Sequence, residues 1–322
     1  MQLDAIRELL ADDMAATDRL IREKLSTDVV LIDQVANYII NSGGKRLRPL
    51  VVVTAGRACG CPPERGVAAA AIIEFIHTAT LLHDDVVDES AKRRGHDTAN
   101  EVWGNQASVL VGDFLYSRSF QMMVEIGEPE VMRILADATN TIAEGEVLQL
   151  INCGNPETTE QQYLDVIFRK TAKLFEAGTR IAAILAGRDE TEQQAMAKYG
   201  KHLGIAFQLV DDVLDYSAST EALGKEVGDD LAEGKPTLPL IHAMRNGSEE
   251  QAALIRLAIT QGGLDKLDEV LAAIESTGAL AYTSKLAVEA AETAKQALTA
   301  IPESPYRDAL AGLADFSVAR AF

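Results

Sequence analysis

The chain reads HTATLLHDDVVD from His77 to Asp88. An apolar, alanine-rich run from Val67 leads into this stretch without Gly or Pro, which predicts a single helix. At about 100° per residue, His77, Asp84 and Asp88 fall on one stripe of that helix. The two aspartates are one turn apart, so they repel each other unless a cation lies between them. A solvated acidic face accounts equally well for a single DDxxD pattern.

A second copy of the pattern favours a binding site over a solvated face. The sequence from Gln208 reads QLVDDVLD, and Asp211, Asp212 and Asp215 repeat the spacing in another apolar helical context. Acidic turns within largely buried helices require a compensating positive charge. Oxygen ligands favour a hard cation, and Mg2+ bound by a few carboxylates usually shares its coordination with substrate phosphates. We therefore expect Mg2+ at the two acidic motifs.

Composition indicates helix-on-helix packing. The 322 residues suffice for one large domain or two ordinary ones, and 47% are hydrophobic. Aromatic residues are few, at 5%, whereas Ala and Leu are plentiful, which suits helices more than sheets. A net charge of −19 argues against nucleic-acid partners. No linker divides the sequence, so we expect a single all-α domain over residues 1–322.

Sequence features also bear on location. Cys59, Cys61 and Cys153 imply no disulfide framework, which fits a reducing cytoplasm. The N-terminus is acidic within a few residues, unlike a signal peptide. The longest apolar runs are far short of the ~20 residues that a membrane span needs. We expect a cytoplasmic protein with no membrane span.

Periodicity and Gly or Pro breaks predict helices along the chain and no strand of any length. Pro49 is expected to open one of these helices. The richest loop signal covers residues 223–236. Besides the helix of the first acidic motif, the predicted helices cover residues 2–24, 29–40, 50–58, 105–126, 130–150, 159–186, 190–218 and 236–245 and much of 249–322.

Basic residues gather near glycines in the polar loops. The stretch GGKRLR, residues 43–48, lacks the spacing of a P-loop but offers flexible backbone and three cations. Arg93 and Arg94 follow the first acidic motif closely. Arg binds phosphate oxygens bidentately and Lys binds them as a point charge. Together with carboxylate-held Mg2+, these cations predict a site for diphosphates.

The motifs, taken in order, resemble those of the trans-isoprenyl diphosphate synthases, a family of prenyltransferases. The resemblance covers about residues 30–245. Within the family, the sequence looks like the long-chain polyprenyl diphosphate synthases of the octaprenyl type, which make quinone side chains. The matching motifs are GGKRLRP from Gly43, DDVVD from Asp84, RRG from Arg93, KT from Lys170, FQLVDDVLD from Phe207 and GK from Gly234.

The resemblance implies a helical bundle around a deep central cavity, usually a homodimer. It implies an Mg2+-dependent enzyme that adds successive isopentenyl diphosphate units to an allylic diphosphate such as farnesyl diphosphate. The expected product is a long all-trans polyprenyl diphosphate, of octaprenyl length, whose release involves transient membrane contact. In this reaction Mg2+ and cations neutralise the leaving diphosphate while the allylic C–O bond ionises.

The resemblance also implies residue roles. Asp84 and Asp88 would hold two Mg2+ ions and Asp211 a third, all with bound diphosphate. Lys170 and Lys235 would join these aspartates as catalytic residues. Asp85, Asp212 and Asp215 would support the metal ligands. The allylic diphosphate would bind to Arg93, Lys170, Thr171, Gln208, Lys225 and Lys235, and isopentenyl diphosphate to Lys45, Arg48, His77 and Arg94.

Product length is expected to depend on an apolar tunnel. Ala79 and Thr80, just before the first acidic motif, would form its first wall. Met122 and Met123, long and adaptable side chains, would form its floor. Ala79 also fits a second interpretation, in which a small side chain lets two helices pack closely.

Four other interpretations stay open. A terpene cyclase shares DDxxD, although a different second metal motif would be expected. Glu74 and His77 match the E-x-x-H pattern of di-iron proteins, but that fold needs two copies. The pair His83-Asp84 resembles the start of an HD-type phosphohydrolase site. A non-catalytic subunit would carry the same motifs. No role is expected for the C-terminal tail.

Overall fold

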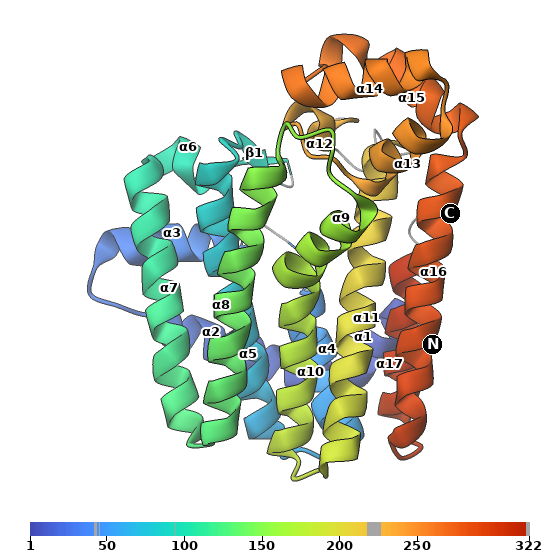
Figure 1. Ribbon diagram of the computed structural model, residues 1–322. Helices are drawn as coiled ribbons and strands as arrows, with labels where there is room; N and C mark the ends of the chain where they lie inside the picture. The colour runs from blue at the N-terminus through green and yellow to red at the C-terminus, as the bar shows by residue number, and fades with distance from the viewer. Residues whose placement is uncertain (42–43, 45, 94, 218–226, 320–322) are drawn as a thin grey trace. The chain divides into compact units, whose positions relative to one another are not determined.

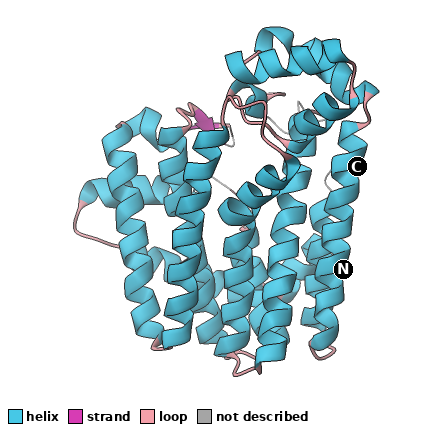
Figure 2. Cartoon of the chain, viewed as in Figure 1, coloured by secondary structure: helices cyan, strands magenta, loops and turns pink. Residues whose placement is uncertain are grey.

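The computed structural model describes residues 1–41, 44, 46–93, 95–217 and 227–319 (Figure 1). These residues are almost entirely helical, and one hairpin of two short strands interrupts the helices (Figure 2). The all-α class predicted from the sequence is therefore confirmed.

The chain forms two compact units, each assembled from three separate segments. Unit 1 comprises Met1–Thr139, Leu174–Gly200 and Ala297–Leu313. Unit 2 comprises Asn140–Lys173, Lys201–Gln296 and Ala314–Phe322. That residues 1–322 form a single domain stays a prediction.

Unit 1 is built around α5 (Pro63–Val87), the helix of the first acidic motif. Pro63 occupies the first turn, where its missing N–H is not needed. Helix α5 packs extensively against α7 (Asn105–Ile126). Unit 1 also contains α1 (Leu3–Leu9), α2 (Ala11–Leu25), α3 (Val30–Asn41), α4 (Leu47–Cys59), β1 (Lys92–Arg93), β2 (His96–Asp97), α6 (Ala99–Trp103), η4 (Leu298–Ala300) and most of α10 (Lys173–Leu185) and α17 (Pro305–Ala319).

Helix α5 is long and apolar enough to cross a membrane by length and composition alone. This differs from the expectation that every apolar run is too short. The most apolar window of α5 is 72% buried, and residues on nearly every side of the helix lie in the core. Such burial is typical of the central helix of a helical bundle.

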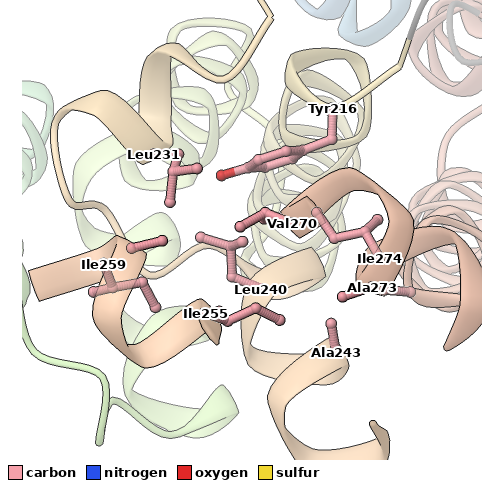
Figure 3. Packing of buried hydrophobic residues seen from close by; sticks show 11 residues of the cluster. Tyr216, Leu231, Leu240, Ala243, Ile255, Ile259, Val270, Ala273 and Ile274 are labelled. Atoms are coloured by element: carbon pink, nitrogen blue, oxygen red, sulfur yellow. The ribbon is translucent and has the colours of Figure 1, made fainter. Parts of the chain in front are cut away.

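Unit 2 contains the second acidic motif and a separate hydrophobic core. Tyr216, directly after α11 (Glu190–Asp215), packs against Leu231 and Val270, with its hydroxyl directed toward Leu231 (Figure 3). This core anchors the short helix α12 (Asp229–Ala232) against the helices that follow it. Unit 2 contains α9 (Glu160–Ile167), η1 (Phe168–Ala172), α12 (Asp229–Ala232), α13 (Leu238–Asn246), α14 (Glu249–Gln261), η3 (Leu264–Lys266), α15 (Leu267–Ser276) and α16 (Ala279–Ala297), and both units share α8 (Pro129–Asn152) and α11 (Glu190–Asp215).

The structure corrects several predicted boundaries. The helix expected over residues 2–24 is divided at Leu10, whose backbone leaves the helical region. The helix expected to open at Pro49 begins at Leu47. Pro49 still falls in the first turn, where its missing N–H costs the helix no hydrogen bond. The helix expected over 159–186 contains a π-helical turn, η1. The hairpin of β1 and β2 was missed because its strands are only two residues long.

Candidate functional site

The first acidic motif forms the last turn of α5 in unit 1. Asp85 is fully buried, whereas Asp84 and Asp88 are half-buried. Arg93 donates from Nε to Asp85 Oδ1 at 2.8 Å, and its Nη2 lies 2.6 Å from the same oxygen. Within the described part of the chain, Oδ2 of Asp85 is buried without a hydrogen-bond partner. The middle aspartate therefore faces the protein, and the outer two are the more accessible.

The β1–β2 hairpin explains how Arg93 reaches Asp85. The register pairs Arg93 with His96, which folds the chain back just beyond α5. Burial raises the pKa of Asp85, and the hydrogen bond from Arg93 opposes that rise. Arg93, expected to bind the allylic diphosphate, thus has a carboxylate partner in this structure.

Two residues expected to bind isopentenyl diphosphate meet in unit 1. Nη1 of Arg48, on α4, lies 2.9 Å from Nε2 of His77, on α5, across 29 residues of sequence. The guanidinium of Arg48 also lies 4.8 Å from the ring centre of Phe175, in a cation–π arrangement. The Phe175 ring and the His77 imidazole together orient the Arg48 guanidinium.

Arg46 has a different environment from Arg48, although both belong to the same basic motif. Its Nη1 lies 2.5 Å from Oε1 of Glu74, and its Nη2 donates to the carbonyl of Ile40 at 2.9 Å. Arg46 therefore joins the end of α3 to α5 and stabilises the fold. The other predicted cations Lys45, Arg94 and Lys225 lie outside the described residues.

In unit 2, a chain of hydrogen bonds surrounds the second acidic motif. Thr171 Oγ1 donates to Gln208 Oε1 at 3.0 Å, and Gln208 Nε2 donates to Asp212 Oδ1 at 2.9 Å. The hydroxyl of Tyr163 donates to the other carboxylate oxygen of Asp212. This network joins α9, η1 and α11, and it contains three residues assigned to the site from the sequence.

Tyr163 is a site residue that the sequence reasoning missed. It precedes Lys170 by seven residues, which is about two turns of a helix, so both are expected on one helical face. This spacing was the sequence signal that could have identified Tyr163. Burial raises the pKa of Tyr163 well above its usual value, and the neighbouring carboxylate of Asp212 raises it further. Burial likewise raises the pKa of Asp212 to about 8.

The π-helical turn η1 carries Lys170 and Thr171. Such turns are rare and are frequently found at functional sites. Gly145, on α8, makes room for it, because a methyl group there would lie 2.8 Å from the backbone nitrogen of Lys170. Close contact with α8 thus fixes the turn from which both side chains project.

The network borders a pocket of about 160 Å³ within unit 2. Its wall includes Tyr163, Lys170, Thr171, Gln208, Asp212 and Lys235. Lys235 follows Gly234, whose φ of +68° favours glycine and whose carbonyl accepts a hydrogen bond from Gly154 N at 2.9 Å. Two cations, two hydroxyls and an amide thus line this space beside the carboxyl group of Asp212, and the two cations suit the binding of an anion.

The remaining aspartates of the second motif differ in burial. Asp211 is half-buried, and Asp215 is buried with its Oδ2 accepting from the backbone nitrogen of Asp230 at 3.2 Å. Among the described residues, no group of three or more His, Cys, Asp or Glu side chains is arranged to hold a metal. Accessible carboxylates in small number fit Mg2+ that completes its coordination with phosphate and water. That the two motifs face one common site stays a prediction.

The structure disfavours two rival interpretations. Glu74 and His77, the E-x-x-H pair, have the arginines Arg46 and Arg48 as neighbours, and a di-iron site would need carboxylates and histidines there. The ring of His83 packs on α7, where its Nε2 lies 3.1 Å from the carbonyl of Val109. A side chain at Gly112 would overlap this ring, so His83 serves helix packing.

The residues expected to control product length lie on α5 and α7. Ala79 is fully buried, and Met122 and Met123 are buried on α7. Thr80 is half-buried and donates to the carbonyl of His77 at 2.8 Å. Burial of Ala79 is consistent with both a tunnel wall and close helix packing.

Comparison with known proteins agrees with these motifs. Residues 29–276 match the family model described as polyprenyl synthetase. The octaprenyl diphosphate synthase of Escherichia coli is 54% identical over 99% of both chains. The crystal structure of a decaprenyl diphosphate synthase from Rhodobacter capsulatus gives a TM-score of 0.94 at 46% identity over 99% of both chains. A polyprenyl synthase from Caulobacter crescentus, complexed with calcium and isoprenyl diphosphate, gives 0.94 at 45% identity over 98% of this chain and 97% of that one.

The family model covers both acidic motifs and the basic motifs between and around them. The Escherichia coli relative and the Rhodobacter capsulatus structure each match over 99% of this chain. The chain therefore belongs to the polyprenyl synthetase family of prenyltransferases.

Proposed function

We propose that the protein is an Mg2+-dependent synthase that adds isopentenyl diphosphate repeatedly to an allylic diphosphate such as farnesyl diphosphate. The observation that carries this proposal is the pocket of unit 2, where Lys170, Lys235 and Thr171 surround a carboxylate network. An octaprenyl product is proposed because the Escherichia coli relative bears that name at 54% identity. The Rhodobacter relative is a decaprenyl diphosphate synthase, so the number of isoprene units in the product has to be measured.

Three Mg2+ ions are proposed to bind together with diphosphate, held by Asp84, Asp88 and Asp211. Mg2+ supplies a Lewis acid that neutralises charge on the leaving diphosphate. The calcium and isoprenyl diphosphate in the Caulobacter relative support a divalent cation of this kind. Asp85, Asp212 and Asp215 are buried and hydrogen-bonded, which suits residues that orient the accessible ligands.

The proposed division of substrate-binding residues follows the two units except at Arg93, which belongs to unit 1 and is assigned to the allylic diphosphate. Lys170, Thr171, Gln208 and Lys235 of unit 2, with Lys225 and Arg93, bind the allylic diphosphate. Arg48 and His77, with Lys45 and Arg94, bind isopentenyl diphosphate so that its double bond attacks the allylic carbon. The 2.9 Å contact between Arg48 and His77 supports a shared role.

A homodimer is proposed as the working form. Leu110 and Val124 on α7 are 65% and 64% exposed, and Phe120 on the same helix is also exposed. These exposed apolar side chains of one helix are proposed to form part of the dimer interface. The cytoplasmic location and transient membrane contact for product release are proposed on the sequence alone.

The test is incubation with radiolabelled isopentenyl diphosphate, farnesyl diphosphate and Mg2+, followed by mass analysis of the dephosphorylated products. Prenyl alcohols of eight isoprene units are expected, and none in excess chelator. Absence of any condensation product would contradict the proposed activity. Longer or shorter chains would contradict the octaprenyl assignment alone.

A further inference from the structure

The two lysines of the unit 2 pocket each have a carboxylate partner. Nζ of Lys170 lies 2.6 Å from Oε2 of Glu146, and Lys235 forms an ion pair with Glu233. The side chains of the two lysines are only 19% and 17% exposed. Ion pairs with such limited access to water are less screened than ordinary surface pairs.

The position of Glu146 is fixed by the local fold. Gly145 places α8 directly against the π-helical turn, with no room for a side chain between them. On the other side of Gly145, Glu144 lies 2.7 Å from Nη1 of Arg169, whose Nε donates to Asp165. The two glutamates that flank Gly145 thus pair with two consecutive bases, and Lys170 is the base that lines the pocket.

A diphosphate in this pocket would have to compete with both glutamates for the lysines. Each condensation releases one inorganic diphosphate, which must leave before the lengthened allylic diphosphate can occupy the same cations. A negative charge beside each lysine opposes the binding of an anion by Coulomb repulsion. The fixed glutamates therefore favour release over tight retention.

We propose that Glu146 and Glu233 compete with diphosphate for Lys170 and Lys235, which lowers the affinity of the pocket and promotes release of inorganic diphosphate. This inference rests on the proposed function, because it assumes that the pocket binds the diphosphate of the allylic substrate. It assigns a role to two residues that neither hold metal nor touch the reacting carbon.

The test uses Glu146→Gln, which keeps the side-chain size and removes the charge. Inorganic diphosphate is titrated calorimetrically into the full-length protein with Mg2+ and without allylic substrate. The variant is expected to bind about fivefold more tightly, equal to about 1 kcal/mol. Glu233→Gln is expected to act in the same direction. Glu144→Gln, with the same charge change two residues away, is expected to bind as the wild type does.

An unchanged or weaker affinity of folded Glu146→Gln would overturn the inference. An equal gain in Glu144→Gln would also overturn it, since a general charge effect would then suffice. If Glu146→Gln does not fold, Glu233→Gln serves as the test. Tighter binding of diphosphate by that variant would support the inference, and unchanged or weaker binding would overturn it. A wild-type protein that binds no diphosphate would instead contradict the proposed function.

Discussion

Tyr163 donates a hydrogen bond to Asp212 across 49 residues of sequence, and both side chains are buried. Asp212 receives a second hydrogen bond from Gln208. This relationship joins α9 to the acidic turn of α11, and both residues lie in the wall of the unit 2 pocket.

Tyr163→Phe is expected to lower the free energy of unfolding by about 1–3 kcal/mol, because a buried carboxylate loses one donor. Urea unfolding of the metal-free protein measures the change. Tyr216→Phe is the matched control, since that buried phenol accepts from Thr237 at 3.3 Å. The control is expected to cost about 0.5–1.5 kcal/mol. Equal costs for the two variants would argue against a special role of Tyr163.

Neighbouring aspartates of the first motif are expected to respond differently. Asp84→Ala should reduce turnover by orders of magnitude and leave stability nearly unchanged, because Asp84 is half-buried and proposed to hold Mg2+. Asp85→Ala, in contrast, should lower the free energy of unfolding by about 1–3 kcal/mol, because Arg93 loses its buried partner. Turnover assays and thermal unfolding of both variants separate the roles. Full activity of Asp84→Ala would remove it from the metal ligands.

The two arginines of the basic motif provide another matched pair. Arg48→Ala is expected to raise KM for isopentenyl diphosphate at least tenfold, with little change in KM for the allylic substrate. Arg46→Ala is expected to destabilise the protein by about 2–3 kcal/mol, because Glu74 would be left buried without its cation. Steady-state kinetics with each substrate varied in turn gives the answer. Equal rises of both KM values in Arg48→Ala would contradict the assignment.

The buried cysteines give a pH-dependent prediction. Burial raises the pKa of Cys59 to about 12 and that of Cys61 to about 11. The folded state therefore prefers both thiols protonated, and stability from this source is complete below the unfolded pKa near 9. It is lost as pH rises from about 9 toward 12. Alkylation at pH 8 should modify half-buried Cys153 first, and rapid modification of Cys59 in the folded protein would contradict its burial.

Sequence patterns predicted the helical class, and several residues that they assigned to the site contact one another in the structure. Helical periodicity and Gly or Pro breaks gave α7 with its observed bounds. The spacing in DDxxD predicted three aspartates on one helical turn. It did not indicate which of the three carboxylates points into the protein. That depends on the neighbouring hairpin, whose Arg93 pairs with Asp85.

Other features depend on tertiary contacts that no local pattern contains. The π-helical turn at Lys170 follows from packing against Gly145, 25 residues earlier. Likewise, Arg46 and Arg48 belong to the same basic motif, and the sequence does not separate their roles. In the structure Arg46 pairs with Glu74 and stabilises the fold, whereas Arg48 contacts His77 of the candidate site. Tyr163 was missed because a lone tyrosine in a helix usually packs in the core.

A substitution at Ala79 is expected to change the length of the product. Ala79 is fully buried one turn before His83, the residue that packs on α7, and α7 carries the buried Met122 and Met123. If Ala79 lines the tunnel for the growing apolar chain, a large side chain there should block elongation. Ala79→Tyr is then expected to give a folded enzyme whose products are only a few isoprene units long, as mass analysis would show.

If Ala79 instead serves helix packing, Ala79→Tyr should overpack the core, at a cost of about 1–3 kcal/mol, without shortening the product. Ala36→Tyr is the matched control, because Ala36 is equally buried but lies on α3. The control is expected to lose stability and keep its product length. A destabilised Ala79→Tyr with unchanged products would refute the tunnel assignment, whereas short products at near-normal stability would establish Ala79 as the wall that the chain must pass.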